Sequence, residues 1–268
     1  MGLPHGSTGA PALDVAVTAA RRAGAVLAER FHGPMAITYK GPYNPVTDAD
    51  LMAEKACLEV LRDEFPSSGI LSEESEPVSG ESGYTWVVDP LDGTRNYTAG
   101  IPHFAVVVAL ARGSQVLLGV THDPLLDETF TAQSGGPALL NGAPISVSPK
   151  EEISGSVLAF DMGYASERAL HALQMVTSMW PEFQSLRLMG SAALGLAYAA
   201  CGRVDLYFHH HVSPWDIASG LLLVAAAGGR TVTRSGGPAD LDSGSVIAAG
   251  PSLVDAFLAA TEGAAWRR

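Results

Sequence analysis

The chain has 268 residues, 47% of them hydrophobic, which is enough to bury a substantial core in one large domain or two smaller ones. Its 28 acidic residues outnumber its 16 lysines and arginines, so the formal net charge is −12. No basic run or basic-aromatic pattern occurs, which argues against a nucleic-acid polymer or an anionic membrane as a partner.

The N-terminal segment, residues 1–11, is rich in Gly, Pro, Ser and Thr, and we expect it to be frayed. It lacks the basic start and apolar core of a signal peptide, and no apolar run is long enough to span a bilayer. We therefore expect a soluble cytoplasmic protein. Cys57 and Cys201 lie in apolar, helical-looking segments, which favours buried thiols over a disulfide.

The first half of the sequence predicts two helices followed by an antiparallel sheet. Apolar residues at helical spacing predict an amphipathic helix over 13–31, ended by Gly33 and Pro34. A turn-rich loop at 40–45 leads into a second helix over 47–65. A short strand at 70–71 and a polar hairpin or flap at 77–83 follow. The sheet is predicted from β-patterned runs at 85–88, 104–110, 115–123, 128–132 and 145–147.

The second half alternates strands with helices. Strands are predicted at 156–160, 185–188, 204–208, 230–233 and 246–249, and helices at 166–179, 191–201, 214–227 and from 251 onward. Because composition and pattern change near Pro149, we expect an α+β domain over 1–149 and an α/β domain over 150–268.

The turn around which the chain is organised is Asp89-Pro-Leu-Asp-Gly-Thr94, directly after the predicted strand at 85–88. Asp89 and Asp92 stand three residues apart on a bend that Pro and Gly enforce. Two carboxylates held so close repel each other unless a cation lies between them, and all-oxygen ligands suit Mg²⁺ or Mn²⁺. Gly93 permits a close approach of the backbone, so the turn predicts a metal pair beside a phosphate cradle.

Each acidic residue also has a purely structural explanation. The turn could be a solvated surface bend, and Asp50 could complete a capping box with Thr47. Asp216 could complement a helix dipole in a first turn, and Glu73 could belong to a solvated acidic loop.

Four stretches in order resolve these alternatives: 45–50 (Pro-Val-Thr-Asp-Ala-Asp), 72–75 (Ser-Glu-Glu-Ser), 88–94 (Val-Asp-Pro-Leu-Asp-Gly-Thr) and 215–220 (Trp-Asp-Ile-Ala-Ser-Gly). Together they resemble the inositol monophosphatase family of Mg²⁺-dependent, lithium-sensitive phosphomonoesterases, and the resemblance covers nearly the whole chain. It implies a layered αβαβα sandwich of the inositol monophosphatase and fructose-bisphosphatase type, and a homodimer.

The resemblance also implies a set of metal ligands. Glu73, Asp89 and the carbonyl of Leu91 would hold one Mg²⁺, and Asp89, Asp92 and Asp216 a second. Glu73 would help with a weaker third ion.

The remaining roles implied by the resemblance concern catalysis and phosphate binding. Thr94, hydrogen-bonded to Asp50, would orient and activate the attacking water, with Glu73 also acting in catalysis. The backbone N–H groups of Gly93 and Thr94 would hold the phosphate.

The residues that would contact the alcohol part of the substrate are Arg187, Gly190, Ser191, Ala192 and His209. His209 stands where the inositol-specific enzymes have a Glu, which weakens the case for inositol itself. Of the consecutive histidines 209–211, neighbours on a strand point to opposite faces. A polar rim that reads the substrate is therefore favoured over a transition-metal site.

Arg95 adds a mixed signal about the branch of the family. It resembles the nucleotide-phosphatase branch, whereas Asn96-Tyr97 and residues 100–104 resemble the inositol and sugar branch.

We therefore expect Mg²⁺-dependent hydrolysis of a small phosphorylated metabolite, a cyclitol or sugar phosphate, by direct attack of water. The alternatives within the same chemistry are a nucleoside phosphate or 3′,5′-bisphosphate, and histidinol phosphate. An alternative of another class is a catalytically silent protein that binds a phosphate ligand or a partner. Retention of all the acidic positions argues against it.

Overall fold

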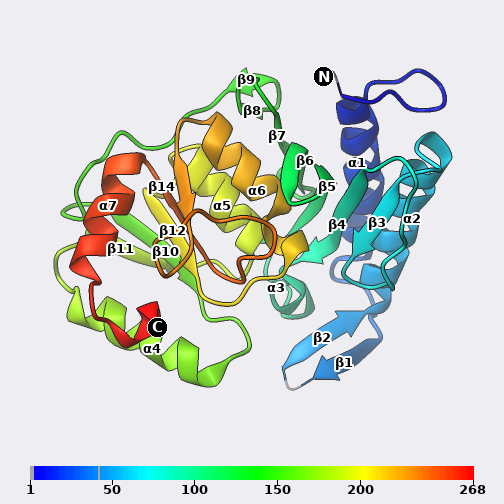
Figure 1. The fold of residues 1–268 in the computed structure, drawn as a ribbon. Coiled ribbons are helices and arrows are strands. Elements are labelled where there is room, and N and C mark those ends of the chain that lie inside the picture. Colours follow the sequence, from blue (N-terminus) through cyan, green and yellow to red (C-terminus); the bar gives the residue numbers. More distant parts are fainter. Residues whose placement is uncertain (1–2, 42) are drawn as a thin grey trace.

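The computed structural model of the protein describes residues 3–41 and 43–268, and arranges them as alternating layers of helices and sheets (Figure 1). The first sheet has seven strands in the order β3-β4-β5-β6-β7-β8-β9. Strands β3 and β4 pair in parallel, and all the other neighbours are antiparallel. The strands are β3 (Gly69–Ser72), β4 (Thr85–Asp92), β5 (Ala105–Arg112), β6 (Gln115–Asp123), β7 (Glu128–Gln133), β8 (Leu139–Leu140) and β9 (Ala143–Pro144).

One face of this sheet is covered by α1 (Ala12–Arg30) and α2 (Asp48–Glu64). Their apolar stripes and the inward side chains of β4, β5 and β6 form one buried cluster that includes Trp86 and Tyr97. Alternate side chains of these strands therefore face α1 and α2, as expected for a sheet with one face covered by helices.

The second sheet has five strands in the order β11-β10-β12-β14-β13, mixed in direction. Strand β10 is parallel to both β11 and β12, whereas β14 is antiparallel to β12 and β13. The strands are β10 (Val157–Asp161), β11 (Ser185–Leu188), β12 (Leu206–His209), β13 (Arg230–Val232) and β14 (Val246–Ala249).

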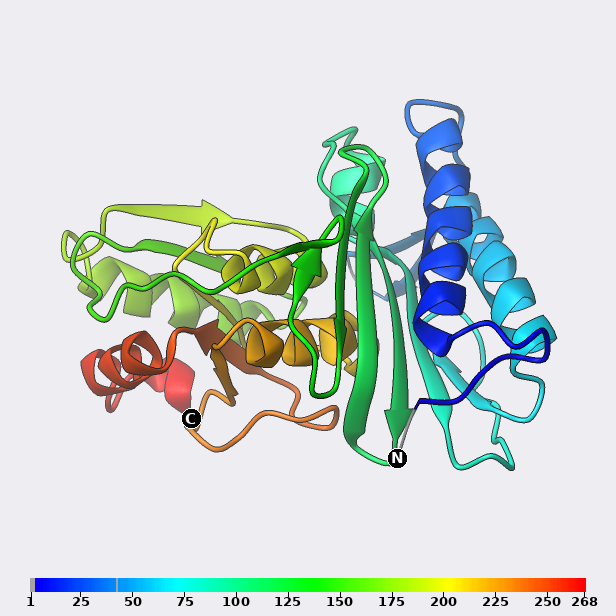
Figure 2. The same cartoon turned by 90° about the horizontal axis from the view of Figure 1, so that it is seen from above.

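The helices of the second half divide between the two faces of this sheet, as the view from above shows (Figure 2). Helices α5 (Ala192–Ala200) and α6 (Pro214–Ala226) lie between the two sheets, and their side chains share a buried cluster with residues of both. Helices α4 (Ser166–Ser178) and α7 (Pro251–Ala260) pack on the outer face, and the chain ends in a 3₁₀ turn, η1 (Ala265–Arg267). The layers run helix, sheet, helix, sheet, helix, which confirms the predicted αβαβα sandwich.

Small residues explain why α6 can occupy the middle layer. A Cβ atom on Gly119 of β6 would lie 2.7 Å from the Cα atom of Ser219 on α6. A Cβ atom on Gly220 would lie 2.4 Å from a methyl group of Leu196 on α5. Because both positions are glycine, α6 approaches β6 and α5 more closely than any side chain would permit.

Three local predictions are wrong, and one short helix was not predicted. Residues 3–11 are not frayed: the Thr8 hydroxyl and N–H donate to the Glu64 carboxylate at the end of α2. The region predicted as a loop at 40–45 belongs to a hairpin of β1 (Ile37–Gly41) and β2 (Asn44–Thr47). A short helix, α3 (Thr94–Thr98), follows the central turn, and residues 145–147 form no strand.

Both cysteines are free, as predicted, with Cys57 buried and Cys201 only half-buried. Among the described residues, no helix is both long and apolar enough to cross a membrane.

Candidate metal and phosphate site

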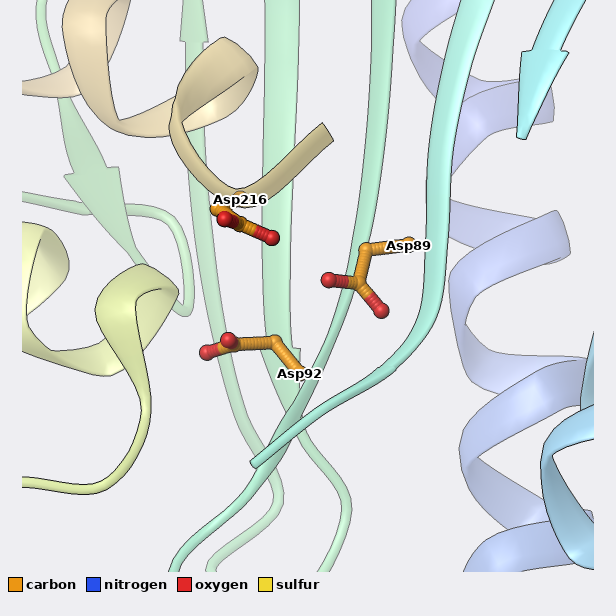
Figure 3. Close-up of side chains that lie close together, drawn as sticks. All are labelled: Asp89, Asp92 and Asp216. Carbon is orange, nitrogen blue, oxygen red and sulfur yellow. The ribbon is translucent and has the colours of Figure 1, made fainter. Parts of the chain in front are cut away.

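Three aspartates from two distant parts of the chain meet where the two halves of the sequence adjoin. Asp89 and Asp92 end β4, and Asp216 lies in the first turn of α6. One carboxylate oxygen from each lies within 4.8 Å of the others. Figure 3 shows the three side chains projecting from the end of β4 and the start of α6 into the same space.

The bend that brings Asp89 and Asp92 together is built into the β4–β5 pairing. Asp89 pairs with Val107 and Asp92 with Ala105, so the register shifts between the two aspartates. Gly93 then turns the chain with φ 98°, and a Cβ there would meet the carbonyl oxygens of His103 and Gly190 at 3.1 and 3.2 Å. The predicted need for glycine at this position therefore has a conformational and a steric cause.

The electrostatics of the three aspartates favour a bound cation. Removal from water raises the pKa of Asp89 and of Asp216 well above the usual range, and the negative charges nearby raise both further. None of the three forms an ion pair with a lysine or arginine in the described part of the chain. An all-oxygen donor set with uncompensated negative charge fits Mg²⁺ or Mn²⁺.

Asp92 is further fixed by the start of α5. It accepts hydrogen bonds from the Ser191 hydroxyl and from the backbone N–H groups of Ala192 and Ala193, at 3.3 and 2.9 Å for the latter two. Burial raises the pKa of Asp92 to about 6, and these donors oppose the increase. Two residues predicted to contact substrate thus also hold a predicted metal ligand in place.

Asp50 and Thr94 are in direct contact, as the resemblance implied. The Thr94 hydroxyl lies 3.2 Å from Asp50 Oδ1 and 3.1 Å from the Leu91 carbonyl oxygen. Asp50 Oδ2 accepts from the backbone N–H and the hydroxyl of Thr47, at 2.8 and 2.5 Å. The capping box is therefore real, and it leaves one Asp50 oxygen for Thr94, so the structural and the functional explanations of Asp50 are compatible.

Glu73 and its neighbour Glu74 are bridged by Lys40 of the β1–β2 hairpin. Lys40 Nζ lies 3.0 Å from Glu73 and 2.7 Å from Glu74. Burial raises the pKa of Glu74 to about 7. Sequence reasoning did not single out Lys40, because it lies in a segment that predicted only a turn.

A cavity of about 570 Å³ joins these groups. Its walls include Glu73, the three aspartates, Gly93 and Thr94, together with four of the predicted substrate contacts, Gly190, Ser191, Ala192 and His209. Arg187 is not part of the lining: it lies exposed on β11, an edge strand, and its Nη1 donates to the carbonyl of Leu186.

The consecutive histidines point to opposite faces. His209 and His211 line the cavity, whereas His210 is fully buried elsewhere. Burial lowers the pKa of His209 to about 3, so its ring is neutral at pH 7. Among the described residues, the one cluster of potential metal ligands contains no histidine.

Two further wall residues were missed. Asp161, at the end of β10, accepts from the Gly190 N–H and, at 2.8 Å, from the Tyr207 hydroxyl, and burial raises its pKa to about 7. Tyr164 follows on the loop after β10. The signal that could have found them is their place just after a strand, where acidic and aromatic side chains reach a cleft.

Comparison with known proteins identifies the family of the chain. A sequence profile of the inositol monophosphatase family matches residues 10–265. A relative from Pasteurella multocida, named Nus factor SuhB, is 38% identical over 252 residues, covering 92% of this chain and 94% of its own. Inositol monophosphatase 1 from Solanum lycopersicum is 36% identical over 257 residues, with 93% and 94% covered.

Solved structures show the same fold. Extragenic suppressor protein suhB from Bartonella henselae superposes with a TM-score of 0.88 at 34% identity, covering 93% of this chain and 98% of its own. The inositol monophosphatase from Anabaena (Nostoc) sp. PCC 7120 gives 0.80 at 35% identity, covering 92% and 94%. The chain is a member of the inositol monophosphatase family.

Proposed function

We propose that the protein is a Mg²⁺-dependent phosphomonoesterase that hydrolyses a small phosphate ester by direct attack of water. The observation that carries this proposal is the convergence of Asp89, Asp92 and Asp216, without a basic partner, in a cavity that also holds the Thr94–Asp50 pair. The leading substrate class is a cyclitol or sugar phosphate.

The metal-binding role is proposed for the oxygen ligands at the end of β4. Asp89, Asp92 and Asp216 would hold one ion, and Glu73, Asp89 and the Leu91 carbonyl another, with Glu73 contributing to a weaker third. Bound Mg²⁺ would neutralise the phosphate, lower the pKa of the attacking water and shield the departing alkoxide.

Thr94 and Asp50 would position the water. When the single hydrogen of the Thr94 hydroxyl is donated to Asp50 Oδ1 and not to the Leu91 carbonyl, the hydroxyl oxygen can accept a hydrogen bond from water. A proton leaving the water can then pass to Thr94 as the Thr94 proton passes to Asp50. Asp50 is 1% exposed, so the pair is shielded from competing solvent.

The phosphate and alcohol parts of the substrate would contact different residues of the cavity wall. The N–H groups of Gly93 and Thr94 would hold the phosphate, and Gly190, Ser191, Ala192 and His209 would contact the alcohol. Since His209 is neutral and supplies no negative charge, it does not favour a cationic alcohol such as histidinol.

The setting of the reaction is also proposed from the resemblance: a cleft between units 1–149 and 150–268 of a cytoplasmic homodimer. A nucleoside phosphate or 3′,5′-bisphosphate is the alternative substrate class.

The test is phosphate release with Mg²⁺, with and without EDTA. The panel comprises inositol 1-phosphate, sugar phosphates, AMP, a 3′,5′-bisphosphate and histidinol phosphate. Asp92→Asn should lose at least about a hundredfold in kcat with an unchanged circular dichroism spectrum. Asp242→Asn, which alters an exposed acid outside the cavity, is the matched control. Near-normal turnover by Asp92→Asn would contradict the proposal that Asp92 is a Mg²⁺ ligand.

A second candidate is a binding protein without catalysis, which the name of the bacterial relatives, Nus factor SuhB, favours. Mg²⁺ binding measured by calorimetry, together with no phosphate release from any ester, would support this candidate over the enzyme.

A further inference from the structure

Arg95 lies in the cavity wall, where three separate contacts hold its side chain. It is the second residue of α3, directly after Thr94. Its Nε donates to the Tyr43 carbonyl at 2.9 Å and its Nη1 to the Gly163 carbonyl at 3.3 Å. Its guanidinium carbon lies 4.2 Å from the centroid of the Tyr164 ring. A guanidinium fixed by two carbonyls and an aromatic face loses little further freedom when it binds a ligand.

The charge of Arg95 is not neutralised by an acidic side chain in the described part of the chain. No carboxylate pairs with it in the described ranges 3–41 and 43–268, whereas Lys40, the other basic residue of the cavity wall with a fixed charge, is paired with Glu73 and Glu74. Two of the five guanidinium hydrogens are donated to backbone carbonyls. The Nη2 group and the second Nη1 hydrogen have no acceptor in the same ranges, so they form an unoccupied donor fork at the cavity wall.

Such a fork matches a planar or tetrahedral anion. Arg95 follows Thr94, whose N–H is proposed to hold the phosphate that is hydrolysed. A second anionic group at Arg95 would therefore belong to the same small molecule. The aspartates of the cavity would repel such a group, and the unpaired guanidinium supplies the compensating attraction.

We propose that Arg95, stacked on Tyr164, binds a second anionic group of the substrate, a phosphate or a carboxylate, so that the preferred esters carry this group besides the phosphate they lose. This inference rests on the proposed phosphatase function and narrows its substrate class. It differs from a purely mechanical role, in which Arg95 only ties the β1–β2 hairpin to the loop after β10.

The test compares matched esters that differ in the second group. Glycerol 3-phosphate against 3-phosphoglycerate tests a carboxylate, and fructose 1-phosphate against fructose 1,6-bisphosphate tests a phosphate. We expect the wild type to prefer the second member of at least one pair in kcat/KM. Arg95→Gln should reduce that preference about ten- to a hundredfold, mainly through KM. Arg95→Lys should restore part of it, because it keeps the charge without the fork.

Arg22→Gln, which removes an exposed arginine of α1 outside the cavity wall, is the control and should keep the wild-type preference. Equal turnover of both members of each pair by the wild type would overturn the inference. So would an equal loss on both members in Arg95→Gln, which is the signature of a mechanical role.

Failure of the proposed function would look different. If the wild type releases phosphate from no ester, calorimetric titration of the Mg²⁺-loaded protein with the same pairs decides the role of Arg95. Tighter binding of 3-phosphoglycerate or fructose 1,6-bisphosphate than of its partner, lost in Arg95→Gln, would support the inference. Equal binding would contradict it.

Discussion

At the scale of single residues, the site combines side chains that stabilise the fold with side chains that destabilise it. Asp50 and Asp92 accept several hydrogen bonds and are anchored by them. Asp89 accepts one, from the Leu91 N–H at 3.0 Å, and is almost fully buried. A buried carboxylate with so few donors and with acidic neighbours is unfavourable unless a proton or a cation joins it.

The sign of the pH dependence follows from these raised pKa values. The pKa is raised to about 6 in Asp92, to about 7 in Asp161 and well above its usual range in Asp89, so the folded state binds more protons than the unfolded chain above about pH 4. The stability contributed by these groups is present below about pH 4 and is lost as the pH rises through 6 to 7.

We therefore predict that the metal-free protein loses stability between pH 5 and pH 7.5, and that Mg²⁺ restores it at the higher pH. In the metal-free protein, Asp89→Asn should weaken the dependence of stability on pH and raise the melting temperature at pH 7.5 by about 2–4 °C. It should also abolish the increase caused by Mg²⁺. Calorimetric scans with EDTA and with Mg²⁺ measure both effects, and a metal-free wild type that becomes more stable from pH 5 to 7.5 would contradict the prediction.

At the scale of elements, the sequence predicted those with a strong apolar pattern. The long strands of the first sheet and the helices of the middle layer follow alternation or helical spacing, and most of their bounds agree to within a few residues. The β1–β2 hairpin was missed because β1 is exposed along nearly its whole length and so shows no alternation. Helix α3, with five residues, is too short to show a helical period.

The wrong strand at 145–147 has a related cause. Ile145 and Val147 are partly buried and pack against the middle-layer cluster, so their alternation is real, but no neighbouring strand pairs with them. The position of Arg187 outside the cavity lining depends on the place of β11 at a sheet edge, which four residues of sequence cannot reveal. The roles in the site came from the family motifs, whereas the contacts of Lys40 and Arg95 depend on folding across the cavity.

The placement of α6 gives a prediction at this scale. Gly119→Ala would put a methyl group 2.7 Å from the backbone of Ser219 and push α6, with Asp216, away from β6. We expect a loss of about 1–3 kcal/mol in the free energy of unfolding and weaker Mg²⁺ binding. Urea unfolding and calorimetric titration measure these, with Gly237→Ala as the control, since its added methyl would make only an ordinary contact at 3.8 Å. If Gly119→Ala were destabilised but bound Mg²⁺ with unchanged affinity, the close packing of α6 on β6 would not be needed to position Asp216.

At the scale of the whole molecule, the two halves of the sequence share their interior. The middle-layer cluster contains Val87, Ala109 and Phe130 from the first sheet together with residues of α5, α6 and the second sheet. The first sheet therefore buries one face only against helices from the second half of the chain. A division at residue 149 separates the elements of the two sheets along the sequence. The shared core argues that the two parts depend on each other for stability.

Two buried tryptophans allow this dependence to be measured. Trp86 lies in the cluster under α1 and α2, and Trp266 lies in the cluster under α4 and α7. These two pairs of helices form the opposite outer layers of the molecule (Figure 1). We predict that, in each of two variants keeping only Trp86 or only Trp266, with the other tryptophans changed to Phe, urea unfolding followed by fluorescence has the same midpoint and m-value as unfolding followed by circular dichroism. Each variant's circular dichroism transition is the internal control for its own stability. Because the two halves of the chain share the middle-layer cluster, one cooperative transition is expected. If fluorescence and circular dichroism gave separate midpoints within one variant, the two halves would be independently stable domains, and the site between them would be formed by docking rather than by folding.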